Sequence, residues 1–304
     1  MACFHPITGY RPRHGAGLVF NTKDGYADRE VRVACNNCVG CRIDRSRAWA
    51  TRCLHEAKMH DVSMCVTLTY DNEKLPEGGT LVKKHFRDFI KRLRQHCWRK
   101  HKKKIRFFHC GEYGENLSRP HYHALIFGHW MEDARFWKQT KKKANLYRSS
   151  LLDKIWGHGL CSIDTVTFTS ASYCAGYIFK KVSGERAAQH YGTLDPETGE
   201  LVQRQAEYIT MSTNPGIGAT FYEKYGDEIH RHDNVITNGK TNKVPKFYDK
   251  LLKRRKAETL EAIKKGRLKR ALGKSVLVNS KPERLATREK VTKARINLNK
   301  RSEI

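Results

Sequence analysis

Two histidines separated by one residue, His121 and His123, are the clearest candidates for chemistry in this sequence. Pro120 opens their segment and the apolar run 124–127 closes it, a pattern typical of a strand that enters a core. Successive side chains of a strand point to opposite faces, so the two imidazoles share one face and Tyr122 points the other way. Two imidazoles on a rigid strand can bind a metal ion. An isolated His-x-His pattern is more often structural, so further ligands must decide between the two interpretations.

A carboxylate on the preceding predicted strand can supply a third ligand. The apolar segment 104–110 leads into Gly111 and Glu112, and a short loop separates it from the strand of the two histidines. Strands joined by a short loop are typically antiparallel neighbours, so we expect Glu112 to lie near His121. One carboxylate and two imidazoles form a three-ligand site for Mg²⁺ or Mn²⁺ and leave coordination positions for a substrate.

A predicted helix with two tyrosines is the second candidate for chemistry. Tyr173, Tyr177 and Lys180 lie at positions i, i+4 and i+7, so they share one helix face, with Lys181 one step round it. Two aromatic side chains at this spacing often pack in a core. A tyrosine near a lysine is also suited to attack phosphate, because an ammonium group stabilises the phenolate of a side chain whose pKa is about 10. Two such tyrosines can cut a DNA strand and later rejoin it without ATP.

Three cysteines have the spacing of a zinc knuckle. Cys35, Cys38 and Cys41 are separated by two residues each, which lets consecutive thiolates turn onto one ion. Either Cys3 or His5 can supply the fourth ligand of a structural Zn²⁺ site; the alternative is a group of reduced surface cysteines. Five other cysteines lie singly in apolar segments and are predicted to be buried and reduced: Cys65, Cys97, Cys110, Cys161 and Cys174.

The composition points to a polyanionic partner. The chain has 304 residues with 59 Lys or Arg against 31 Asp or Glu, a formal net charge of +28. Such an excess favours binding to nucleic acid or to an anionic membrane surface. No run of 18 apolar residues is present, and residues 1–6 lack the apolar centre of a signal peptide. We therefore expect a nucleic-acid partner and no membrane.

The candidate residues need a scaffold of alternating strands and helices. Runs of apolar and β-branched residues predict strands over 62–70, 104–110, 121–128 and 160–168. Apolar stripes predict helices over 44–60, 81–100 and 145–156, besides the tyrosine helix. The basic outer face of the 81–100 helix is either solvated or in contact with phosphates. Residues 183–245 are rich in turn residues and are predicted to be irregular.

The chain is predicted to contain three segments. Residues 1–60 form an N-terminal cysteine-containing segment and helix, residues 61–245 the main domain, and residues 246–304 a basic tail. The tail carries 20 Lys or Arg against 6 Asp or Glu, half of the chain's excess positive charge. It favours helix around 249–272 and then loses periodicity, so we expect it to be partly disordered without a polyanion.

Three motifs, taken in order, resemble those of rolling-circle replication initiators, the HUH endonuclease superfamily. They are the strand Val66–Tyr70, the segment Arg119–His123 and the two-tyrosine segment Tyr173–Lys181. The resemblance extends to the replication initiators of the gokushovirus-type Microviridae, which are small single-stranded-DNA phages. The additional segments that carry it are Met1–Cys3, Cys35–Cys41, Cys110–Gly114 and Met211–Gly218.

This resemblance implies a fold and a set of site residues. The implied fold is α+β, with a ferredoxin-like or RRM-like central antiparallel sheet flanked by helices. His121 and His123 match the metal ligands, and Tyr173 and Tyr177 match two alternating nucleophiles. Lys180 and, less directly, Lys181 match residues that assist them. Glu112 as third ligand rests on its position in this chain, because members of the family vary there.

The implied function is the initiation of rolling-circle replication in the cytoplasm of a bacterial host. One tyrosine nicks single-stranded viral origin DNA, becomes linked to the 5′ end as a phosphotyrosine, and frees a 3′-OH for the host polymerase. The second tyrosine later cuts again, and the circle is religated. We find no ATP-driven motor motif and therefore expect dependence on a host helicase. The alternatives are a non-catalytic basic nucleic-acid-binding or packaging protein, and a transposase or plasmid relaxase of the same superfamily.

Overall fold

The structure is a computed structural model that describes residues 3–114, 117–140, 143–176, 185–194, 199–237 and 239–301. Its contacts group the chain into two units. One unit is Ser46–Leu252, and the other combines Met1–Arg45 with Lys253–Ile304. The division into segments 1–60, 61–245 and 246–304 stays a prediction.

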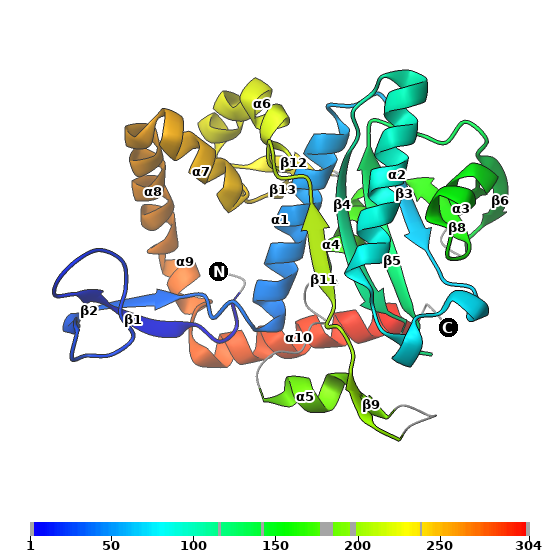
Figure 1. Cartoon of the computed structure of the whole chain (residues 1–304). Coiled ribbons are helices and arrows are strands. Elements are labelled where there is room, and N and C mark those ends of the chain that lie inside the picture. The colour runs from blue at the N-terminus through cyan, green and yellow to red at the C-terminus, as the bar shows by residue number, and fades with distance from the viewer. Residues whose placement is uncertain are drawn as a thin grey trace. The chain divides into compact units, whose positions relative to one another are not determined.

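A seven-stranded antiparallel sheet is the centre of the Ser46–Leu252 unit (Figure 1). Its spatial order is β11-β4-β5-β3-β8-β7-β6, so neighbours in space are often distant in sequence. The strands are β3 (Ser63–Leu68), β4 (Arg106–Tyr113), β5 (Pro120–Phe127), β6 (Arg135–Gln139), β7 (Asn145–Arg148), β8 (Cys161–Thr165) and β11 (Tyr208–Met211). The predicted α+β class with an antiparallel sheet is confirmed, and all four predicted strands are present.

One face of the sheet packs against α2 (Lys83–His101) and α3 (Ser150–Trp156). The apolar stripe predicted for 81–100 is buried along α2, because residues three and four apart lie on one side of a helix. Tyr122 of β5 is fully buried on this face. Its hydroxyl bonds that of Tyr70 at 2.8 Å and donates to the carbonyl of Val82 at 3.0 Å. The predicted inward orientation of Tyr122 is therefore confirmed.

The opposite face packs against α1 (Val39–Ala57) and α4 (Phe168–Gly176). Small side chains on these helices let the backbones approach the sheet, where Phe108 and Leu125 are fully buried. The alternation of β5 places His121 and His123 on this face together with Leu125. The five cysteines predicted to be buried are buried: Cys65, Cys97, Cys110, Cys161 and Cys174.

The predicted irregular structure over 183–245 is wrong for the described residues. They contain α5 (Arg186–Tyr191), β9 (Gly192–Leu194), β10 (Leu201–Gln203), β11, α6 (Ala219–His232), β12 (Val235–Thr237) and β13 (Lys240–Asn242). Turn residues join these short elements and mask their periodicity in the sequence. A buried carboxylate holds the start of α6, because Glu56 accepts hydrogen bonds from the N–H of Gly218 at 2.6 Å and from Arg106 Nε at 2.5 Å.

The second unit contains a hairpin and basic helices. Its elements are β1 (Ile7–Pro12), β2 (Gly25–Val33), α8 (Ala257–Ala271), α9 (Lys274–Val278) and α10 (Pro282–Arg301), and α7 (Lys246–Arg255) precedes α8. The predicted helix at 249–272 was too short, because α9 and α10 follow it. Most of their side chains are exposed, so helix-favouring residues rather than an apolar stripe specify them. Partial disorder of this segment stays a prediction.

None of the helices within the described ranges is both long and apolar enough to cross a membrane.

Candidate active site

Glu112, His121 and His123 converge on one face of the sheet. Glu112 of β4 lies directly opposite His121 of β5 in the antiparallel register, as the sequence predicted. One carboxylate oxygen, Glu112 Oε1, lies 2.7 Å from His121 Nε2 and 2.9 Å from His123 Nε2. Glu112 is 1% exposed, whereas 18% of the His121 side chain remains accessible. Three predicted ligands therefore form a cluster with one edge open to solvent.

The second nitrogen of each imidazole has its own partner. His121 Nδ1 lies 3.1 Å from the carbonyl oxygen of Arg119, and a carbonyl can only accept, so Nδ1 donates. His123 Nδ1 lies 2.9 Å from the hydroxyl of Thr67 on the neighbouring strand β3. A proton on Nδ1 leaves the lone pair on Nε2, the atom that faces Glu112. Such outer contacts orient metal-binding histidines in proteins.

The spacing of the three ligand atoms suits a small divalent cation. Adjacent ligands of an octahedral Mg²⁺ ion, bound at about 2.0–2.1 Å, lie about 2.9 Å apart. The two distances from Glu112 Oε1 to the imidazoles are 2.7 and 2.9 Å. Three protein ligands leave coordination positions open, as a catalytic site requires. The residues present therefore fit the predicted site for Mg²⁺ or Mn²⁺.

The histidines also determine the charge of the buried carboxylate. Burial by itself raises the pKa of Glu112, but hydrogen bonds from His121 and His123 outweigh it and hold the pKa below its usual value. Glu112 is therefore ionised at neutral pH, which is the form that binds a cation.

Tyr173 lies beside the cluster on α4. Its ring meets that of His123 edge to face, with centroids 5.0 Å apart, and 52% of the residue is exposed. Thr167 and Ser170 fix the start of the helix through reciprocal side-chain to backbone hydrogen bonds of 2.8 and 3.1 Å. Buried Ala171 and Cys174 hold α4 against the sheet. The structure thus joins one predicted nucleophile to the predicted ligands; Tyr177, Lys180 and Lys181 lie outside the described residues.

Two supporting residues were not predicted. Thr67 lies on a strand that the sequence places correctly, but its contact with His123 depends on the pairing of β3 with β5. Arg119 donates to the carbonyl of Tyr70 at 2.9 Å and to Asn72 Oδ1 at 2.7 Å, which holds the approach to β5. Only the position of Arg119 two residues before His121 could have indicated this role.

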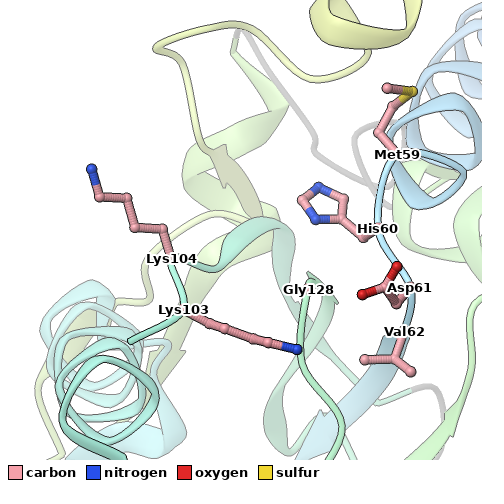
Figure 2. A pocket seen from close by; sticks show the side chains of 7 residues that line it. All are labelled: Met59, His60, Asp61, Val62, Lys103, Lys104 and Gly128. Atoms are coloured by element: carbon pink, nitrogen blue, oxygen red, sulfur yellow. The ribbon is translucent and has the colours of Figure 1, made fainter. Parts of the chain in front are cut away.

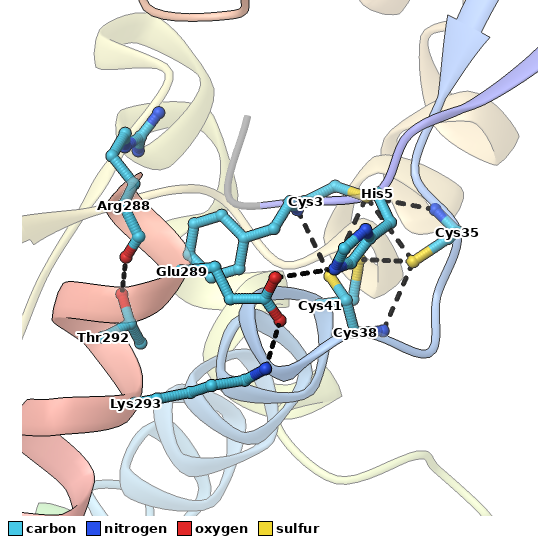
Figure 3. A network of polar contacts seen from close by, with 10 residues as sticks. Cys3, His5, Cys35, Cys38, Cys41, Arg288, Glu289, Thr292 and Lys293 are labelled. Atoms are coloured by element: carbon cyan, nitrogen blue, oxygen red, sulfur yellow. Dashed lines mark hydrogen bonds and ion pairs between the residues drawn. The ribbon is translucent and has the colours of Figure 1, made fainter. Parts of the chain in front are cut away.

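The four-cysteine cluster forms within the other unit (Figure 3). Cys3 Sγ lies 3.6 Å from Cys35 Sγ and 3.9 Å from Cys38 Sγ, and Cys35 Sγ lies 3.9 Å from Cys41 Sγ. Thiolates bound to one zinc ion at about 2.3 Å lie about 3.8 Å apart in a tetrahedron. Of the two predicted fourth ligands the structure selects Cys3, because His5 Nε2 instead contacts Glu289 Oε2 at 2.7 Å.

Backbone amides point at the sulfurs of this cluster. The N–H of Phe4 lies 3.3 Å from Cys38 Sγ, and the N–H of Cys35 lies 3.3 Å from Cys3 Sγ. Burial raises the pKa of the Cys38 thiol, but these and other hydrogen bonds outweigh it and lower the pKa to about 6. Donors of this kind stabilise thiolates, and thiolates are the form that binds zinc.

A surface pocket lies at the far end of β5 from His121 (Figure 2). Met59, His60, Asp61, Val62, Lys103, Lys104 and Gly128 line it. Seven residues separate His121 from Gly128 on an extended chain, a span of about 23 Å. This pocket is therefore separate from the candidate ligands.

Comparisons with known proteins agree on one family. Residues 63–182 match a family model of phage-type initiators described as replication-associated protein ORF2. The matched region extends from β3 past α4 and contains Glu112, His121, His123 and Tyr173. No solved structure matches the chain.

Three curated relatives are replication-associated proteins of phages. VP4 of Bdellovibrio phage phiMH2K is 31% identical over 264 residues, which cover 85% of this chain and 79% of the relative. ORF2 of Spiroplasma virus 4 is 29% identical over 276 residues, which cover 84% and 81%. ORF4 of Chlamydia phage 1 is 28% identical over 235 residues, which cover 75% and 55%.

Proposed function

Because the chain belongs to the family of phage replication-associated proteins, we propose that it initiates phage DNA replication by nicking one strand at the origin. The observation that carries the proposal is the cluster of Glu112, His121 and His123 beside the exposed ring of Tyr173. Carboxylate and imidazole ligands next to a nucleophilic hydroxyl are suited to phosphoryl transfer.

The proposed site binds Mg²⁺ or Mn²⁺ through Glu112 Oε1 and the Nε2 atoms of His121 and His123. When bound, the cation supplies Lewis-acid polarisation of the scissile phosphate. Thr67 and the Arg119 carbonyl keep both rings in the orientation that offers Nε2. The sheet thereby fixes the position of the phosphate before the reaction begins.

Tyr173 is the proposed nucleophile. Its phenolic oxygen forms a bond to phosphorus while the bond from phosphorus to the 3′ oxygen breaks. The leaving 3′ oxygen takes up a proton and becomes the 3′-OH from which the host polymerase extends. The 5′ end remains on Tyr173 as a phosphotyrosine, whose energy allows later religation of the circle.

We propose Tyr177 as the alternating nucleophile, with Lys180 and Lys181 assisting by neutralising charge on phenolate and phosphate. These roles rest on the resemblance of the two-tyrosine segment to HUH endonucleases. The same resemblance supports an HUH, RRM-like arrangement of the sheet. A net charge of +28 supports single-stranded origin DNA as the partner, and host helicase and polymerase in the bacterial cytoplasm complete the proposed pathway.

We further propose that the cysteine cluster binds a structural Zn²⁺ ion. Four sulfurs at tetrahedral spacing close the coordination shell and leave no position for a substrate. The ion would join the residue at position 3 to the start of α1 across the β1–β2 hairpin. Intact-protein mass spectrometry under native conditions should show one zinc per chain, and a folded, zinc-free protein would contradict this part of the proposal.

The direct test is cleavage of labelled single-stranded oligonucleotides tiled across the noncoding region of the encoding genome. With Mn²⁺ or Mg²⁺ we expect one cleavage position and a protein–DNA adduct at the 5′ end. The combined Tyr173→Phe and Tyr177→Phe variant should bind DNA and form no adduct. Absence of cleavage at every metal concentration would favour the alternative of a non-catalytic nucleic-acid-binding or packaging protein.

A further inference from the structure

The β6–β7 ribbon, defined as Arg135–Gln139 and Asn145–Arg148, presents aromatic rings that no core explains. Every residue of β6 is exposed, with Phe136 at 61% and Trp137 at 46%. Exposed aromatic residues on a strand are costly to hydration and typically mark a binding surface. The ribbon was absent from the expected scaffold, because its sequence alternates too little to predict strands.

Cationic side chains surround the exposed rings. Lys138 Nζ lies 4.0 Å from the centre of the Trp137 ring, and Arg148 Cζ lies 5.2 Å from it. Phe136 meets Tyr147 edge to face at 6.2 Å. Arg148 also pairs with Asp153 at 3.1 Å, which fixes its position beneath the indole. The rings are thus held in place by neighbours on the ribbon itself.

The charge of the segment selects the partner. Residues 134–152 contain six Lys or Arg and no Asp or Glu. A second copy of this chain would bring two such segments together, and their like charges would repel. A polyanion with planar, unpaired bases satisfies both the charge and the rings.

Edge geometry argues against another strand as the occupant. β6 is the terminal strand of the seven-stranded sheet, so its outer edge is unpaired among the described strands. The β6–β7 register shifts between Phe136 and Lys138, which is the signature of a bulge at Trp137. A bulge and a lysine on an edge strand discourage addition of a further strand. The exposed rings are therefore available for a different type of contact.

The register of the sheet connects the ribbon to the candidate active site. The cross-strand row from His123 continues through Thr67 to Ser162. Tyr147 pairs with Ile163, so its successor Arg148 lies at the level of Ser162. β5 and β6 are four strand spacings apart, or about 19 Å. A strand of DNA that follows this row from the metal ligands would reach Trp137.

We propose that the β6–β7 ribbon binds single-stranded DNA by stacking bases on Phe136 and Trp137, and so guides the strand that passes through the nicking site. This inference rests on the proposed function for its choice of DNA. Stacking requires unpaired bases, so the ribbon should contribute to binding of single strands and not of duplex. The lysine and arginine residues contribute the salt-dependent part.

The test is fluorescence anisotropy with a mixed-sequence single-stranded oligonucleotide and a duplex of equal length, both in EDTA so that no cleavage occurs. The double variant Phe136→Ala/Trp137→Ala should bind the single strand about 100-fold more weakly, or about tenfold per ring. Its affinity for duplex should change less than threefold. Tyr225→Ala is the matched control, because Tyr225 is also an exposed aromatic residue with a lysine nearby, and it should bind like the wild type.

A salt titration separates stacking from charge. The aromatic variant should keep the wild-type slope of log Kd against log salt, whereas Lys138→Ala should reduce it by about 0.7. Equal loss of single-strand and duplex binding in the aromatic variant would contradict the proposal. So would wild-type binding accompanied by a changed oligomeric state in ultracentrifugation.

Failure of the ribbon proposal and failure of the nicking proposal have different signatures. If nicking is absent but single-strand binding depends on the two rings, only the nicking proposal is wrong. If nicking occurs and binding is unaffected by the double variant, only the ribbon proposal is wrong.

Discussion

The two ligand clusters of this protein have similar dimensions and opposite designs. In each cluster the ligand atoms lie within 4.8 Å of one another. Glu112, His121 and His123 project from adjacent strands of a rigid sheet and provide oxygen and nitrogen, with one edge accessible. The cysteine cluster provides four sulfurs from a loop, a segment near the N-terminus and the start of a helix.

The difference teaches what each cluster can do. Three hard ligands on a prebuilt support leave room for a substrate and do not need the metal for folding. Four thiolates saturate a soft ion and leave no room, but their supports are too short to hold position by packing alone. We therefore expect the sheet cluster to provide activity and the cysteine cluster to provide stability. The predictions below test this contrast.

The largest effect is expected from loss of a ligand in the sheet cluster. Glu112→Gln or His121→Ala should reduce nicking by about 10³-fold or more, because metal activation contributes several kcal/mol to such reactions. The melting temperature should change by only a few degrees, since the sheet does not depend on the ion. Glu223→Gln and His232→Ala remove exposed residues of the same types on α6 and should nick normally. Normal nicking by His121→Ala would remove the proposed metal role.

Loss of a cysteine ligand should have the reverse pattern. Cys38→Ala should release zinc and lower the melting temperature or the yield of folded protein, because metal binding and folding of such segments are coupled. Cys38→His should retain zinc with an altered cobalt-substituted absorption spectrum. Cys97→Ala, a buried cysteine outside the cluster, is the control and should keep one zinc per chain. Full zinc occupancy in Cys38→Ala would contradict the four-sulfur site.

A smaller effect is expected from the hydroxyl behind His123. Thr67→Val keeps the shape and removes the hydrogen bond, so the Mn²⁺ concentration needed for half-maximal nicking should rise about 10- to 100-fold. The chain contains a matched control, because Thr210 contacts His109 Nδ1 in the same way at 2.8 Å. His109 is buried against Phe86 and is not one of the candidate ligands, so Thr210→Val should leave the metal requirement unchanged.

The smallest effect concerns stability without any metal. Burial raises the pKa of Glu56, but hydrogen bonds from His60, Gly218 and Arg106 outweigh it and hold the pKa below its usual value. A lowered pKa in the folded state means that the stabilisation is present above the unfolded pKa of about 4.3 and is lost as pH falls through the folded value.

Urea unfolding at pH 6 and pH 3.5 measures this term. The wild type should lose about 1–3 kcal/mol more than Glu56→Gln between the two pH values, which is the range for charged hydrogen bonds. The same difference should appear with and without chelator if the Ser46–Leu252 unit is stable independently of metal. An equal pH response in both proteins would exclude Glu56 as its source.

Local patterns predicted much of the candidate site. A short loop between two apolar segments was enough to place Glu112 opposite His121, because hairpin pairing is a local property. The burial of α2 followed from its apolar stripe in the same way. Both predictions depend only on residues that are near one another in the sequence.

Long-range pairing accounts for what the sequence did not predict. Thr67 contacts His123 across 56 residues, and no local pattern specifies that β3 lies next to β5. The choice of Cys3 over His5 depends on Glu289, which occupies His5 from the far end of the chain. α6 was missed because its support is a buried carboxylate on α1 rather than a regular apolar stripe.

The measurement that tests the central claim most directly is mapping of the covalent adduct. Wild-type protein is incubated with cleavable single-stranded origin DNA and Mn²⁺, digested with nuclease and protease, and analysed by mass spectrometry. The account predicts a 5′-phosphonucleotide on the peptide that contains Tyr173, formed only with metal and absent from Glu112→Gln. An adduct on a residue other than Tyr173 or Tyr177, or an adduct that forms equally in EDTA, would contradict it.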